Sequence, residues 1–140
     1  MFWKISLVFV FAFLAMNVFA AEHQEMSALP KNSDGYAEIT ADQLNAALKN
    51  KNFTLVNVHI PYEGEIPQTD LQIPFNQIAD NLEKLPGKDQ PIVVYCRSGN
   101  MSKAASRELV SLGYTNIVEL TGGFNAWKQA GYELLRAAKK

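Results

Sequence analysis

The chain has 140 residues, and its 13 lysines and arginines against 14 aspartates and glutamates give a formal net charge of −1. This near-neutral balance, without a run of basic residues, argues against nucleic acid as a partner. The roughly 120 residues that follow the N-terminal apolar segment suit one compact domain and leave little room for a second.

The first 20 residues are typical of an export signal. Lys4 supplies a short positive region, residues 5–19 are mostly apolar, and Val18-Phe19-Ala20 offers a small-residue cleavage site. A retained membrane anchor is the alternative, but about 15 apolar residues fall short of the roughly 20 that span a bilayer. We therefore expect a periplasmic or secreted mature protein that begins near Ala21 and is not stably inserted in the membrane.

A polar lead-in is predicted over residues 21–35, which lack periodicity and contain Pro30 and a turn cluster. The domain is expected over residues 36–140. It opens with a short strand at 36–39, and Thr40 with Gln43 forms a capping-box pattern for a helix that ends near Lys49. A second apolar strand is predicted at 53–58.

Alternating elements fill the second half of the chain. Asn76 is the expected N-cap of a helix over residues 76–85, which Pro86 and Gly87 stop. A β-branched apolar strand at 92–95 precedes a helix at about 102–112, with Gly113 as its C-terminal stop.

A strand at 116–120 and a helix at 124–130 complete the pattern. Strands that alternate with helices predict an α/β fold, a mainly parallel sheet with helices on both faces.

Cys96 is the only cysteine of the chain, and it lies where the strand at 92–95 breaks into a loop that leads to a helix. Backbone N–H groups of such a loop and the start of the helix dipole favour a thiolate and bound anions. Gly99 suits the loop because glycine takes positive φ without steric cost. A free cysteine at a strand end is often a small buried hydrophobe, but the polar loop, the helix and the cation Arg97 favour a functional thiol.

Two motifs, found in this order, resemble the rhodanese family of sulfurtransferases. They are Val93-Val-Tyr-Cys-Arg-Ser-Gly-Asn-Met-Ser102, and Leu120-Thr-Gly-Gly-Phe-Asn-Ala-Trp127 about 25 residues later. The resemblance covers roughly residues 36–134. It implies a small parallel-sheet α/β domain in which Cys96 takes a sulfane sulfur from a donor such as thiosulfate and carries it as a persulfide.

The resemblance implies Cys96 as the catalytic residue, with no cofactor. The substrate-binding loop is then formed by Arg97, Ser98, Gly99, Asn100, Met101 and Ser102. Arg97 either holds an oxyanion of the donor or pairs with a carboxylate to brace the loop. The implied partners are a small sulfur-containing anion and a thiol or cyanide acceptor, with an exported thioredoxin-like protein as a further acceptor.

The chain departs from the family pattern at three places. Many relatives have a cation where this chain has Met101, which puts tight thiosulfate binding in question. The second strand ends with Asn57-Val-His59 in place of Asp-Val-Arg, and Gly64-Glu-Ile-Pro67 replaces Gly-His-Ile-Pro. We expect the fold to tolerate these changes, whereas the substrate preference is open to change.

His59 is a candidate modulator of the thiolate, because the C-terminal ends of parallel strands gather along one edge. A structural role at a strand end is the alternative. The two histidines and one cysteine show no metal-ligand spacing, so no metal site is expected.

Two other functions remain open at this point. A cysteine phosphatase or arsenate reductase would need an arginine six positions after the cysteine, where this chain has Ser102. A redox-sensing or binding module would use Cys96 to form mixed disulfides without turnover.

Overall fold

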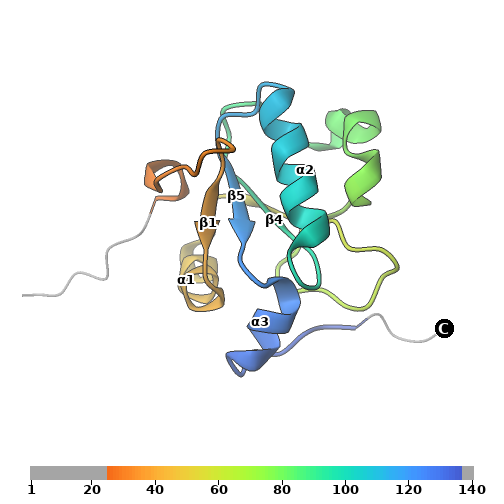
Figure 1. Ribbon diagram of the computed structural model, residues 1–140. Coiled ribbons are helices and arrows are strands. Elements are labelled where there is room, and N and C mark those ends of the chain that lie inside the picture. The colour runs from red at the N-terminus through yellow and green to blue at the C-terminus, as the bar shows by residue number, and fades with distance from the viewer. Residues whose placement is uncertain (1–24, 137–140) are drawn as a thin grey trace, which may run out of the picture.

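Five strands form a single parallel sheet in the computed structural model, which describes residues 25–136. The predicted export segment, 1–20, lies outside these residues. The strand order is β1-β5-β4-β2-β3, and every neighbouring pair is parallel. The strands are β1 (Ala37–Ile39), β2 (Thr54–Asn57), β3 (Leu71–Gln72), β4 (Ile92–Tyr95) and β5 (Ile117–Leu120). The predicted parallel α/β fold is confirmed (Figure 1).

Helices cover both faces of this sheet, as predicted. The helices are α1 (Ala41–Ala47), α2 (Asn100–Ser111) and α3 (Gly123–Gln129), and the 3₁₀ segments are η1 (Met26–Ala28), η2 (Leu48–Asn50), η3 (Phe75–Gln77) and η4 (Ala79–Lys84). One core cluster joins the sheet to α1 and α3, and the other joins it to α2, η3 and η4. Successive strand residues such as Val93 and Val94 enter opposite clusters, because side chains alternate across a strand. No helix within residues 25–136 has the length and apolar character that a bilayer crossing requires.

The helix ends follow the local signals in the sequence. Thr40 Oγ1 accepts a hydrogen bond from the Gln43 N–H at 3.2 Å, and Gln43 Oε1 accepts one from the Thr40 N–H at 2.8 Å, so the capping box of α1 is complete. Helix α2 begins directly after Gly99, whose φ is 118°, and ends before Gly113, whose φ is 92°. Both glycines therefore adopt the conformations for which the sequence predicted them.

The continuous helix predicted over residues 76–85 is wrong. The chain forms two 3₁₀ segments there instead, η3 and η4, and Asn81 interrupts the second with φ −130° and ψ 24°. The Asn81 side chain donates a hydrogen bond to the Gln77 carbonyl at 2.8 Å. Asparagine side chains that bond to nearby backbone compete with the helical hydrogen bonds, which explains the break.

The described part of the predicted polar lead-in, residues 25–35, packs onto the domain. Met26 and Leu29 are buried in the core cluster that contains α1 and α3. Lys31 also forms an antiparallel bridge with Ala37 of β1. These residues therefore contribute two apolar side chains to the core, which their polar surroundings in the sequence concealed.

Candidate active site

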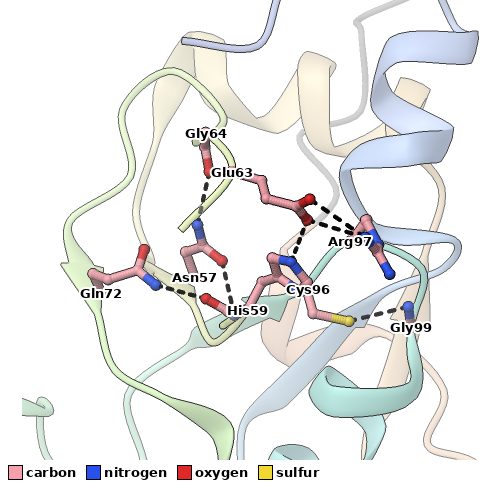
Figure 2. Close-up of polar contacts among 8 residues, drawn as sticks. All are labelled: Asn57, His59, Glu63, Gly64, Gln72, Cys96, Arg97 and Gly99. Carbon is pink, nitrogen blue, oxygen red and sulfur yellow. Dashed lines mark hydrogen bonds and ion pairs between the residues drawn. The ribbon is translucent and has the colours of Figure 1, made fainter. Parts of the chain in front are cut away.

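Cys96 lies at the C-terminal edge of the sheet, directly after β4, and only 1% of its surface is exposed. The Gly99 N–H donates a hydrogen bond to Cys96 Sγ at 3.1 Å (Figure 2). Ser102 Oγ, in the first turn of α2, lies 3.3 Å from the same sulfur. A backbone donor and the N-terminus of a twelve-residue helix thus meet at the sulfur, and both stabilise negative charge.

The loop residues predicted to bind substrate fall into two groups. Gly99 and Ser102 are buried beside the sulfur, whereas Arg97, Ser98 and Asn100 are exposed. Met101 is half-buried and packs against the core cluster of α2. The substrate-binding role of these residues stays a prediction, and the structure adds that Met101 contributes to packing.

Helix α3 supports the loop from the other side, and this contact explains the second sequence motif. The Phe124 N–H donates to the Cys96 carbonyl and the Asn125 N–H donates to the Arg97 carbonyl, both at 2.9 Å. Gly123 lies so close that a Cβ atom at this position would be 2.3 Å from the Cys96 carbonyl oxygen. The absence of a side chain at Gly123 therefore allows the start of α3 to fix the backbone that carries the Cys96 sulfur.

Arg97 pairs with a carboxylate, one of the two roles that the sequence left open. Its Nη1 lies 3.2 Å from Glu63 Oε2, and the same oxygen is 2.5 Å from His59 Nε2 (Figure 2). The hydrogen bond to His59 lowers the pKa of Glu63, and the Arg97 charge adds to this effect against the opposing desolvation. Glu63 thus links the predicted modulator His59 to the loop of Cys96.

His59 is held firmly in this position. It is 3% exposed, its backbone N–H donates to Asn57 Oδ1 at 3.0 Å, and its ring is perpendicular to that of Phe124, with 5.4 Å between the ring centroids. The carbonyl of His59 also accepts a hydrogen bond from Gln72 at 3.0 Å. The residue therefore has the structural contacts expected at a strand end, and its side chain is joined to Glu63.

Sequence reasoning missed two acidic residues of the site, Glu63 and Glu119. Glu119, in the middle of β5, is 0% exposed, and its Oε1 accepts a hydrogen bond from Ser102 Oγ at 2.7 Å. Burial raises the pKa of Glu119 to about 7, although the Ser102 hydrogen bond and the Lys103 charge oppose this. The sequence signal that could have identified Glu119 is a single carboxylate within the apolar run of residues 117–120, because burying a charged group in a strand costs free energy. For Glu63 the sequence offered only its position four residues after His59.

The residue six positions after Cys96 is the buried Ser102, and its hydroxyl bonds to Glu119. It supplies no guanidinium that could clamp a phosphoryl group in two places, as cysteine phosphatases require. Among residues 25–136, no group of three or more His, Cys, Asp or Glu side chains is placed to hold a metal ion.

Comparison with known proteins agrees with this geometry. A model of the rhodanese-like domain matches residues 40–130. A sulfurtransferase from Allochromatium vinosum is 34% identical over 102 residues, which cover 70% of this chain and 94% of the relative. The thiosulfate sulfurtransferase GlpE of Pseudomonas syringae is 31% identical over 84 residues, covering 59% of this chain and 78% of that protein. A rhodanese-related protein from Thermoplasma volcanium has a solved structure with a TM-score of 0.62 and 32% identity, covering 71% of this chain and 98% of that one. The chain therefore belongs to the family of rhodanese-like domains.

Proposed function

We propose that this protein is a sulfurtransferase that moves a sulfane sulfur from thiosulfate or a similar donor to a thiophilic acceptor through a persulfide on Cys96. The observation that carries the proposal is the Gly99 N–H at 3.1 Å from Cys96 Sγ, at the start of α2. Donors fixed in this way stabilise a sulfur that becomes or stays negatively charged. The names of the relatives, sulfurtransferase and thiosulfate sulfurtransferase, support the same chemistry.

The reaction has two displacement steps at sulfur. The Cys96 thiolate attacks the outer sulfur of thiosulfate, the bond between its two sulfurs breaks, and sulfite leaves with the electron pair. The Cys96 persulfide anion then gives its outer sulfur to a nucleophile, and the Cys96 thiolate is the leaving group. Cyanide as nucleophile yields thiocyanate, and a small thiol or an exported thioredoxin-like protein are the acceptors we propose. Charge stays on sulfur throughout, so the donors at Gly99 and α2 serve both steps, and no cofactor is needed.

The cationic contribution to the donor site is small. Arg97 is exposed, but Glu63 partly neutralises its charge, and Met101 packs against the core instead of providing a second cation. A doubly charged anion gains less from such a site than from two free cations. We therefore propose weak affinity for thiosulfate, with catalysis that depends mainly on the backbone donors.

Mass spectrometry tests the proposed chemistry. The purified mature protein is incubated with thiosulfate, its intact mass is measured, and cyanide is then added. We expect a gain of one sulfur that cyanide removes with release of thiocyanate, and no gain in Cys96→Ser. An unchanged mass after thiosulfate, together with glutathione adducts in a separate incubation with oxidised glutathione, would support a redox-sensing module instead, and sulfur transfer by Cys96→Ser would show that the site is misassigned.

We propose further that residues 1–20 direct export and are removed, which places the protein in the periplasm or outside the cell. Expression of the full chain followed by fractionation and intact mass measurement tests this. The expected product begins near Ala21 and is found outside the cytoplasm. A full-length product in the cytoplasmic fraction would overturn the proposal.

A further inference from the structure

The buried carboxyl group of Glu119 has no role in the sulfur chemistry described so far. Glu119 lies on the interior strand β5, paired in register with Glu38 of β1 on one side and with Val94 of β4 on the other. Its Oε1 accepts a hydrogen bond from Ser102, whereas its buried Oε2 has no partner among the described residues. A buried carboxyl group with unused acceptor capacity is costly, so its presence calls for a physical reason.

A continuous set of short contacts joins this carboxyl group to the reactive sulfur. Ser102 Oγ lies 2.7 Å from Glu119 Oε1 and 3.3 Å from Cys96 Sγ. All three residues are buried. A serine hydroxyl has one proton to donate and two lone pairs to accept with, so its orientation depends on which neighbour carries a proton.

Ser102 Oγ also lies 3.1 Å from the Gly99 carbonyl oxygen, which is a further acceptor for the hydroxyl proton. Two arrangements of protons satisfy the contacts to Glu119 and Cys96. With an ionised Glu119, the Ser102 hydroxyl donates to the carboxylate and presents a lone pair to Cys96, which then fits as S–H. With a protonated Glu119, the carboxyl group donates to Ser102, and the hydroxyl proton turns to a Cys96 thiolate. The two arrangements carry the same net charge and differ only in the position of the protons.

We propose that Glu119 is a positioning residue that holds, through Ser102, the proton that Cys96 releases, so that the thiol and the carboxyl group share this proton as a coupled pair. The proton leaves the Cys96 S–H bond for Ser102 Oγ, while the hydroxyl proton of Ser102 moves to Glu119 Oε1. No electron is transferred. The use of this pair in sulfur transfer rests on the function proposed above, because a persulfide anion would accept the same Ser102 hydrogen bond.

The surroundings of Glu119 suit such a proton acceptor. The charged groups that act on it are Lys103 of α2, which favours the carboxylate, and Glu38 of β1, which opposes it. The neighbour on β4 is the apolar Val94. Burial is the largest influence and raises the pKa of Glu119 to about 7, so this carboxyl group exchanges its proton in the neutral range.

Coupling of this kind has a distinct signature. Loss of the first proton from the pair gives a mixture of thiolate with carboxylic acid and thiol with carboxylate, so only part of the thiolate forms in this step. The rest forms at higher pH, when the second proton leaves. The amount of thiolate therefore rises in two steps with pH, although the chain has one cysteine.

The ultraviolet absorbance of the thiolate, measured against pH with Cys96→Ser as the blank, tests the proposal without a sulfur donor. We expect two steps in the wild type and in Glu38→Gln, which removes a nearby charge on the exposed face of β1. In Glu119→Gln, which keeps an acceptor for Ser102 but cannot take up a proton, we expect loss of the lower step. One step in the wild type, or two in Glu119→Gln, would overturn the proposal.

Two further measurements cover the role of Ser102 and a failure of Glu119→Gln to fold. Ser102→Ala should lower the amplitude of the first step, because the hydroxyl that joins the thiolate to Glu119 is gone and only the Gly99 N–H still donates to the sulfur; an unchanged amplitude would exclude Ser102 as the link. In the wild type, the infrared band of the protonated carboxyl group should titrate at a different pH after Cys96 is alkylated with iodoacetamide. An unchanged titration would overturn the coupling. These measurements involve no sulfur transfer, so a negative result would leave the proposed function standing. In the same way, a failure of sulfur transfer would leave the proposed coupling standing.

Discussion

Replacing Gly123 by alanine should destabilise the domain far more than an alanine in a left-handed conformation does elsewhere. The new Cβ atom would lie 2.3 Å from the Cys96 carbonyl oxygen and 2.6 Å from both the carbonyl carbon and oxygen of Arg97. These are backbone atoms, so no flexible side chain can move aside. Helix α3 must shift away from the loop, and the hydrogen bonds from Phe124 and Asn125 to these carbonyls, both at 2.9 Å, are strained or lost.

The expected loss of stability follows from these contacts. A left-handed alanine costs roughly 1 kcal/mol relative to glycine. Two lost backbone hydrogen bonds add about 1 kcal/mol each, which brings the total to about 3 kcal/mol. Gly131 provides a matched control, because its φ is also positive, at 89°, but nothing lies within 4 Å of a Cβ atom there. Gly131→Ala should therefore lower the free energy of unfolding only by the roughly 1 kcal/mol of a left-handed alanine.

Urea unfolding followed by the fluorescence of Trp127, a buried residue of α3, measures both variants. The difference between them, about 2 kcal/mol in the free energy of unfolding, isolates the contact between α3 and the loop. Sulfur transfer by the folded Gly123→Ala protein should also fall, because the same backbone carries Cys96. Equal losses in the two variants would refute the argument that this contact requires glycine.

Three other changes have expected outcomes. Glu63→Gln frees Arg97 from its ion pair, so the KM for thiosulfate should fall, by about fivefold at low salt and less at high salt. The pKa of Glu119 is about 7 in the folded protein against an ordinary value of 4.5. A carboxyl group whose pKa is higher in the folded than in the unfolded state stabilises the fold while it is protonated. This contribution is fully present at a pH below the unfolded-state pKa, and it is lost as the pH rises through the folded-state pKa. The unfolding free energy of the wild type relative to Glu119→Gln should therefore fall by roughly 3 kcal/mol between about pH 4 and pH 8. Thr40→Ala removes the N-cap of α1 and should cost about 1 kcal/mol without affecting sulfur transfer.

A specific measurement would contradict each of these three expectations. A KM that is unchanged or raised in Glu63→Gln would mean that Arg97 does not attract the donor. A pH-independent difference between wild type and Glu119→Gln, in denaturant titrations at several pH values, would mean that Glu119 has an ordinary pKa. Loss of sulfur transfer in the folded Thr40→Ala protein would show that α1 influences the active site, which the structure gives no reason to expect.

Local physical rules account for the parts of the fold that were predictable. The strand at β4 was visible as a short β-branched run, and the Thr40 capping box fixed the start of α1. Gly99 and Gly113 marked the ends of α2 because they need positive φ. The break at Asn81 was not predicted, because the choice between a helical and a side-chain hydrogen bond depends on small energy differences that a pattern does not reveal.

The sequence alone determined that a single thiol follows a buried strand and precedes a helix, since strand composition, glycine and helix signals act over a few residues. Only the tertiary structure decided which groups surround that thiol. Glu63 reaches Arg97 across 34 residues of sequence, Glu119 reaches Ser102 across 17, and Gly123 contacts the backbone at Cys96. These neighbours depend on the order and register of β5, β4 and β2, which are selected by packing of the whole sheet and not by the sequence near any one residue.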